Sequence, residues 1–524
     1  MLFRSNVVLG VNINERASTS LSAQTSDLTF ETGFWDLSNG ANKDNITELQ
    51  SKRRSIGLFG DITFGYADQL FIDLTARNDW SSTLPLAKNS YFYPGITASW
   101  VFTELIPKNN VLSFGKLRAA YGMTGNDANV YLTNPSFIQA EAATAYLSDP
   151  AAIVFPFAGT NAFMASATLG SGSLRPEMTS EAEVGLNMQF FGGRLGFDAT
   201  YYHRITDDQI FSLPVDPATG YNRMVTNFGK VRNTGFELAL NTTPVQTRHF
   251  RWDLNFNIAR NWNTVLELPD GLDDGKSIIE GFSTSADKVY AYAEVGKPMG
   301  EFYTNRPKYT DDGKIIVGAD GQPIISADIE DTGKNMQSLW SGGINTSLSF
   351  YGVTISATLD ARLGGWMFSR TKNLMEFTGN GIATTYNGRN PFIIPNSVVD
   401  NGDGTYSENT TPIYLADGSY QKYFDGTGAG LGGEFFLIDR SFAKLRNISI
   451  TWDMPKKWMQ KIRFEAISLT AYVNNVATFT AKDNYYIDPE ASSYAGDGDL
   501  AAQFGELYSN PTSRQYGINV NVKF

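Results

Sequence analysis

The side chains that most often carry catalysis are scarce in this sequence. His203 and His249 are its only histidines, and it has no cysteine. Thiol catalysis, disulfides and Cys-ligated zinc or iron–sulfur sites are therefore excluded, as is a His-rich metal site. We expect His203 to end a strand and His249 to lie in a short turn. The two would then sit at opposite ends of the strands and could not act together as an acid–base pair.

One glycine pattern matches a nucleotide-binding motif, at Gly428, Gly430 and Gly433. A GxGxxG sequence binds pyrophosphate only where it opens a helix whose N-terminus faces the ligand. Here the glycines lie in a long loop and lead into the strand-like run 435–438. We therefore interpret the match as a coincidence in a Gly-rich loop.

Acidic residues cluster in several loops without the spacing of a metal or catalytic site. Residues 400–404 (DNGDG) are similar to a calcium loop but lack the spaced acids and closing Glu of an EF-hand, so a hairpin tip is predicted there. The runs 311–313 and 318–321 are interpreted as turns in the same way. The adjacent acids at 207–208 and 273–274 are expected to be solvated. We expect no cofactor, no metal and no enzymatic activity.

Composition points to strands and away from nucleic acid. The chain has 524 residues, and 42 Lys and Arg against 54 Asp and Glu give a net charge of −12, which does not suit a phosphate backbone. Charged residues make up 18%, aromatic residues reach 13% and Gly numbers 49. No apolar run approaches the roughly 18 to 20 residues of a membrane helix. The start, Met1 to Arg16, also lacks the apolar core of a signal peptide.

The dominant pattern is alternation with a period of two, which places apolar side chains on one face of a strand. It is clearest in the last ten residues, where every second residue from Tyr516 to Phe524 is apolar. The same pattern recurs at 183–190 and 252–258. Read in this way, the sequence predicts about fourteen strands. They begin near Asn6, Ser55, Leu70, Gly95, Ser113, Glu181, Arg194, Thr234, Arg251, Gly342, Val353, Arg446, Ala466 and Gln515.

Short and long connections between these strands are expected to alternate. The predicted short links are 66–69, 104–110, 191–193, 242–250, 351–352 and 453–464. The predicted long loops are 16–51, 80–94, 123–180, 203–232, 262–339, 364–444 and 475–514. Tight turns on one side and long loops on the other are typical of an up-and-down transmembrane β-barrel. Loops above about 12 to 15 residues are uncommon in compact soluble domains, although a soluble β-sandwich or β-solenoid stays open.

Eight segments of the sequence are informative when taken in order: 71–93 (FIDLTARNDWSSTLPLAKNSYFY), 94–102, 116–126 (KLRAAYGMTGN), 174–183, 233–240, 441–450 and 471–479, followed by the ending SRQYGINVNVKF. Together they resemble the barrel of SusC/RagA-type TonB-linked (TonB-dependent) outer membrane transporters. Members of that family carry a signal peptide, an N-terminal extension and a plug domain before a barrel of about 22 strands.

The resemblance implies that residues 1–524 are the C-terminal part of a TonB-dependent receptor β-barrel, without plug domain, N-terminal extension or signal peptide. The expected fold is all-β, an antiparallel up-and-down transmembrane β-barrel with about 14 strands here, as part of a barrel of about 22. The implied location is the outer membrane, where the chain would contact outer membrane lipid.

The resemblance also implies a function, outer membrane import of a nutrient, either an oligosaccharide or a peptide. The implied partners are a SusD-like surface lipoprotein acting as a lid, the TonB complex through a plug missing here, and the barrel assembly machinery. Two alternatives are a passive 14-stranded porin and a soluble surface glycan-binding or adhesin protein. Detergent requirement and single-channel recordings would discriminate among them.

Ligand contacts are expected from aromatic and polar residues of the long loops, because sugar rings stack on Trp and Tyr while carboxylates bind hydroxyls. The candidates are Asp79, Trp366, Tyr386, Tyr485, Tyr486 and Tyr494. The alternative for each is a role in loop packing or in the aromatic girdle of a barrel.

The final strand resembles the signal read by the barrel assembly machinery, and an unpaired strand edge favours strand addition. The residues concerned are Tyr516, Ile518, Val520, Val522 and Phe524. Deleting Phe524 should lower the amount of chain inserted in the outer membrane, measured by membrane fractionation. Normal assembly would argue that Phe524 only completes the apolar face.

Overall fold

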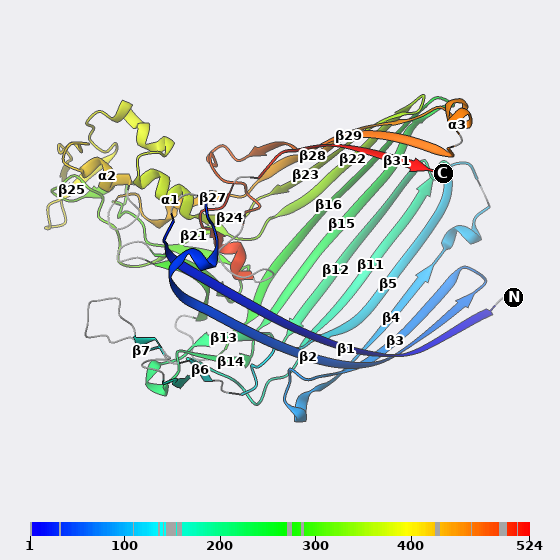
Figure 1. Ribbon diagram of the computed structural model, residues 1–524, viewed down its shortest axis with the longest axis horizontal. Helices are drawn as coiled ribbons and strands as arrows, with labels where there is room; N and C mark the ends of the chain where they lie inside the picture. Colours follow the sequence, from blue (N-terminus) through cyan, green and yellow to red (C-terminus); the bar gives the residue numbers. More distant parts are fainter. Residues whose placement is uncertain are drawn as a thin grey trace. The chain divides into compact units, whose positions relative to one another are not determined.

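The structure is a computed structural model (Figure 1). It describes residues 3–30, 33–107, 109–134, 137–139, 141–142, 153–154, 160–269, 275–283, 288–424, 430–462, 464–491, 500–510 and 512–524. Its contacts divide the chain into two compact units. Unit 1 comprises 1–100, 118–182 and 204–230, and unit 2 comprises 101–117, 183–203 and 231–524.

Fourteen strands form one sheet in which the order of strands follows the order of the chain. They are β1 (Phe3–Leu28), β2 (Gly40–Tyr66), β3 (Leu70–Ser81), β4 (Ser90–Trp100), β5 (Leu112–Asn126), β11 (Glu177–Phe190), β12 (Leu195–Asp207), β15 (Lys230–Gln246), β16 (Phe250–Glu267), β22 (Trp340–Phe350), β23 (Val353–Leu363), β28 (Phe442–Asp453), β29 (Ala466–Thr480) and β31 (Gln515–Lys523). The predicted strand count and the alternation of short and long connections are confirmed.

Side-chain alternation in the sheet also follows the prediction. Along β4, Phe92, Ile96 and Trp100 are exposed on one face, and Phe92 keeps 58% of its surface accessible. Tyr91 lies buried on the other face. The exposed side chains are not covered by a second layer of protein, as a sandwich would require. In a transmembrane barrel such a face contacts lipid. Among the described residues, no helix has the length and apolar character to span a membrane.

The prediction of a loop over 16–51 is wrong. β1 continues to Leu28, β2 begins at Gly40, and the two strands pair from Phe3↔Tyr66 to Leu28↔Gly40. Asn39 closes the connection, since its side chain accepts a hydrogen bond from the Phe30 amide at 3.0 Å and donates to the Phe30 carbonyl at 2.9 Å. Polar residues occupy both faces of this part of the hairpin, since Thr19 and Glu48 share the face of Leu21, so the apolar alternation there is weak.

The long loops contain their own small elements. Three helices are present among the described residues, namely α1 (Arg370–Phe377), α2 (Ser419–Phe424) and α3 (Lys456–Ile462). The small sheets of unit 2 consist of β17 (Lys276–Ser283), β18 (Lys288–Glu294), β19 (Glu301–Thr304) and β21 (Glu330–Asn335); of β24 (Trp366–Ser369), β27 (Leu437–Asp439) and β30 (Gly505–Glu506); and of β20 (Ile315–Val317), β25 (Ser397–Asp400) and β26 (Tyr406–Glu408). Those of unit 1 consist of β10 (Thr168–Leu169), β13 (Ile210–Pro214) and β14 (Arg223–Asn227); of β6 (Phe137–Gln139) and β9 (Phe163–Ala165); and of β7 (Glu141–Ala142) and β8 (Ile153–Val154).

The glycine-rich runs adopt the turns predicted for them. Residues 401–405 form the tip of the β25–β26 hairpin, closed by a hydrogen bond of 3.1 Å from the Asn401 amide to the Thr405 carbonyl. The Gly313 and Gly321 amides close turns at 2.9 Å on Thr310 and Gly318. Gly428 lies outside the described residues, and Gly433 begins a single 3₁₀ turn (Gly433–Phe436) that leads into β27.

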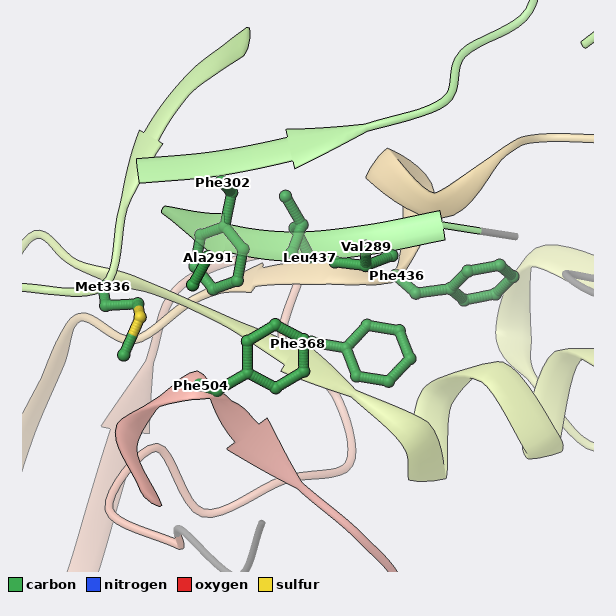
Figure 2. Close-up of a cluster of buried hydrophobic side chains, with 8 residues drawn as sticks. All are labelled: Val289, Ala291, Phe302, Met336, Phe368, Phe436, Leu437 and Phe504. Carbon is green, nitrogen blue, oxygen red and sulfur yellow. The ribbon is translucent and has the colours of Figure 1, made fainter. Parts of the chain in front are cut away.

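Three long loops of unit 2 share one hydrophobic core (Figure 2). Phe302 comes from the loop between β16 and β22, Phe368 from the loop between β23 and β28, and Phe504 from the loop between β29 and β31. The ring of Phe504 lies 5.7 Å from each of the other two rings, and all three are fully buried. Val289, Ala291, Met336, Phe436 and Leu437 complete the cluster.

A buried carboxylate joins two of the same loops. Glu506 of β30 accepts hydrogen bonds from the Ser369 hydroxyl at 2.6 Å and from the Thr371 amide at 3.0 Å, at the start of α1. A negative charge at a helix N-terminus is stabilising. We refer to the three loops together, residues 268–339, 364–441 and 481–514, as the loop body.

We expect Phe504→Ala to destabilise the loop body by about 3–5 kcal/mol, since it removes the ring shared by the other two loops. Thermolysin should then cleave the loop body much faster, while heat-modifiable migration on gels shows the sheet still folded. Tyr508→Ala, at an exposed aromatic residue of the same loop, is the control. Equal cleavage of both variants would mean that the core does not hold the loops together.

Candidate functional site

A network of five charged residues connects the loop body to the polar face of the sheet. Lys444 and Arg446 belong to β28, and Asp360 of β23 lies opposite Lys444 in the register. Asp488 and Glu490 belong to the loop between β29 and β31. The Lys444 ammonium contacts Asp488 Oδ1 at 2.5 Å and Glu490 Oε2 at 2.6 Å. A loop carboxylate pair therefore covers a strand lysine whose side chain is only 5% exposed.

Arg446 reaches the same loop because β28 bulges at this residue. The strand register shifts between Leu445 and Asn447, so the backbone of Arg446 is not paired with a residue of either neighbouring strand. A bulge redirects the side chain of the extra residue. Arg446 binds both oxygens of Glu490, at 2.5 and 2.6 Å, and also hydrogen-bonds Asp360. Paired bonds of this kind fix the geometry of both groups.

The charges of the network change the ionisation of Glu490. Partial burial would raise its pKa, but hydrogen bonds from Arg446 and Lys444 outweigh that effect and lower the pKa to about 2. Nearby, burial lowers the pKa of Arg440 to about 10, and its guanidinium donates to the carbonyls of Pro489 and Gln503 at 3.3 and 3.4 Å. Three cations thus hold this loop against the strands.

The predicted aromatic contacts lie in different settings in the loop body. Tyr485 is exposed, and its ring centroid lies 6.0 Å from that of Tyr486. The Tyr486 hydroxyl accepts a hydrogen bond from the Ile382 amide, at the start of the 3₁₀ segment Ile382–Arg389 that carries Tyr386. The structure thereby connects the Tyr485–Tyr486 pair with the segment of Tyr386, whose half-exposed ring meets Phe392 edge to face at 4.7 Å.

Trp366 is less exposed than Tyr485 and Tyr386. Trp366 begins β24, is half-buried and packs against the loop core, and the Lys334 ammonium lies 4.4 Å from its ring centroid. That geometry is a cation–π contact within the protein. Tyr494 lies outside the described residues.

Asp79 belongs to unit 1, where its carboxylate is already engaged. It accepts two hydrogen bonds from Arg77 Nε, at 2.9 and 3.1 Å, and one from the Tyr93 hydroxyl. Arg77 and Tyr93 in turn line a groove of about 510 Å³ over β2 to β5, together with Gly95 and Gly122. Asp79 therefore positions two groove residues.

The sequence reading missed most of these charged residues. Asp360 and Arg446 lie on predicted strands, whereas Lys444 falls at the end of the predicted loop 364–444 and belongs to β28 in the structure. Their partners Asp488 and Glu490 lie in a loop, and no sequence spacing connects them to the strands. Arg77 was detectable in principle, because it stands two residues before Asp79 and so shares its face.

Comparison with known proteins agrees with this architecture. Residues 3–476 match the family model described as TonB dependent receptor-like, beta-barrel. The chain belongs to the TonB-dependent receptor β-barrel family. Proteins of this family are outer membrane β-barrels, in which the apolar face of the sheet contacts lipid.

Individual relatives are distant in sequence. TonB-dependent receptor P3 of Formosa agariphila is 24% identical over 522 residues, which cover 95% of this chain and 48% of that protein. TonB-dependent receptor SusC of Bacteroides thetaiotaomicron is 23% identical over 468 residues, covering 85% of this chain and 42% of that protein. The chain thus spans about half the length of the relatives that it matches.

The fold has clear counterparts among solved structures. The RagAB peptide importer in its 'open-open' state matches with a TM-score of 0.72 at 20% identity, covering 100% of this chain and 53% of that one. Another structure, that of the RagAB peptide transporter, matches with a TM-score of 0.71 at 18% identity over 100% of this chain and 53% of that one. At these identities the similarities show the fold alone.

Acid should weaken the attachment of the loop at Glu490. A carboxylate with a lowered pKa stabilises fully above its unfolded value of 4.5, and this contribution is lost as pH falls towards 2. We expect Glu490→Gln to remove up to about 3 kcal/mol of unfolding free energy at pH 7 and much less at pH 2. Denaturant unfolding across this pH range measures both. Glu408→Gln, at an exposed position of β26, is the control. Parallel pH curves for wild type and Glu490→Gln would contradict the assignment.

Proposed function

We propose that this chain is the barrel portion of a SusC/RagA-type transporter that imports a nutrient, either an oligosaccharide or a peptide, across the outer membrane. One observation carries the proposal most directly. Three long loops are joined by a common core into a single loop body, and the Lys444–Glu490 network fastens it to the polar face of the sheet. A rigid, aromatic-rich body at one end of a barrel suits ligand capture, because preorganised sites lose less entropy on binding. A passive pore needs no such body.

The proposed partners follow from the same reading. A SusD-like surface lipoprotein would close over the loop body, and TonB would supply energy through a plug domain. This assignment is supported by similarity to SusC and to the fold of the RagAB importer. Assembly would use the barrel assembly machinery, which would recognise β31 and the residue after it. Tyr516, Ile518 and Val520 of β31 are exposed, as is Phe524, which follows the strand.

We also propose that residues 1–524 represent the C-terminal part of a longer transporter. Coverage of about half of each relative supports this, since the relatives match along nearly the whole of this chain. A plug and further strands encoded in frame upstream of Met1 would agree with it. Unrelated coding sequence at that position would contradict it.

Asp79, Trp366, Tyr386, Tyr485, Tyr486 and Tyr494 remain the proposed ligand contacts. Tyr485 and Tyr386 are the most exposed of the described aromatic candidates, and their rings are available for stacking. Asp79 would act by positioning Arg77 and Tyr93.

Replacing Tyr485 or Tyr386 by Ala should weaken ligand binding about 2- to 10-fold each, because one aromatic stacking contact contributes ~0.5–1.5 kcal/mol. Calorimetric titration of the full-length protein with a panel of oligosaccharides and short peptides measures this. Tyr406→Ala, at an exposed tyrosine of the β25–β26 hairpin, should bind as the wild type does. Binding of no member of the panel would overturn the import proposal, and unchanged affinity in both variants would overturn the residue assignment alone.

A further inference from the structure

The connection between β28 and β29 is unusual in its charge. Its residues 454–464 (MPKKWMQKIRF) contain four basic residues and no acidic one, in a chain whose net charge is −12. No other eleven-residue stretch of the sequence holds four basic residues. Most of this connection is helix α3, and the described side chains of Lys456 and Lys457 are exposed.

The helix also presents an aromatic ring next to the apolar face of the sheet. Trp452 lies one residue before the end of β28, on the same face as Ile448 and Ile450, and Ile450 is exposed there. The ring of Trp458 meets that of Trp452 edge to face at 5.9 Å and 87°. Trp458 nevertheless keeps 53% of its surface exposed, whereas Met459 beside it is buried. The aromatic surface of the strands therefore continues onto α3.

The position of α3 along the strands determines what it faces. In Figure 1, α3 lies at the right-hand ends of β28 and β29, whereas α1 and α2 lie beyond the opposite ends of the strands of unit 2. The connection that contains α3 is one of the short links, which lie on the periplasmic side of outer membrane barrels. At that level a lipid-facing surface ends at the headgroups of the inner leaflet.

We propose that α3 is an interfacial anchor that binds the headgroups of anionic phospholipids in the periplasmic leaflet of the outer membrane. Trp458 inserts beside Trp452 at the boundary between acyl chains and headgroups, where indole rings are favoured. Lys456 and Lys457 contact the phosphates, since clustered lysines beside a membrane surface attract anionic lipid. The observations that carry this are charge complementarity and continuity with the lipid-facing strands.

The experiment uses the purified full chain in detergent, titrated with phosphatidylglycerol and, separately, with zwitterionic phosphatidylcholine. Native mass spectrometry counts bound lipid. We expect Lys456→Gln/Lys457→Gln to weaken phosphatidylglycerol binding on the order of tenfold and to leave phosphatidylcholine binding unchanged. Lys456→Arg/Lys457→Arg should retain binding. Lys308→Gln/Lys314→Gln, in the loop body, is the matched control with the same loss of charge.

A second measurement tests the aromatic ring in vesicles. The vesicles consist of phosphatidylcholine and one fifth phosphatidylglycerol, and the phosphatidylglycerol carries bromine near its glycerol. Bromine quenches the fluorescence of nearby tryptophans, so the wild type should lose more tryptophan fluorescence than Trp458→Phe does. Equal binding of phosphatidylglycerol by both lysine-to-glutamine pairs would overturn the proposal. So would equal quenching of wild type and Trp458→Phe, which would show that the Trp458 ring does not lie among the lipids.

Discussion

The requirement that each backbone amide and carbonyl be paired within a membrane underlies the whole structure. Hydrocarbon offers no hydrogen-bond partners, so strands can cross it only in a sheet whose ladders satisfy them. Consecutive antiparallel strands meet this condition with short turns on one side, and the period of two then separates lipid-facing from polar side chains. Leu70, Ile72 and Leu74 on β3 are exposed for this reason, while Asp79 and Arg77 can pair on the opposite face.

Away from the membrane the same chain uses a different source of stability. The loop body is held by buried aromatic rings, above all Phe302, Phe368 and Phe504, and by buried charge. Glu506 at the start of α1 and the Lys444 network are each compensated by several partners, as buried ions must be. The bulge at Arg446 interrupts the ladder, which resumes at Leu445, and it turns the Arg446 side chain to Glu490 of the loop body.

Much of the sheet could be predicted from sequence because alternation is a local signal. The last strand is predicted from the alternation of Tyr516, Ile518 and Val520 alone. The strands at the end of the β1–β2 hairpin were not predicted because polar residues occupy both of its faces. The charged network was not predicted for another reason. Lys444 and Glu490 lie 46 residues apart in the sequence, and only the folded loop brings them together. The aromatic candidates were recognisable by type, yet their exposure depends on packing, which divides Tyr485 from the half-buried Trp366.

The shared core of the loop body has a consequence for how such proteins diversify. Since Phe504 touches rings from both other loops, exchanging any single loop for that of a relative would leave a mismatched interior. Sequence changes that alter ligand preference should then occur at exposed loop tips, such as the hairpin of β25 and β26. Larger changes would have to replace all three loops at once. Recombination breakpoints in natural variants should accordingly fall outside the region between β16 and β31.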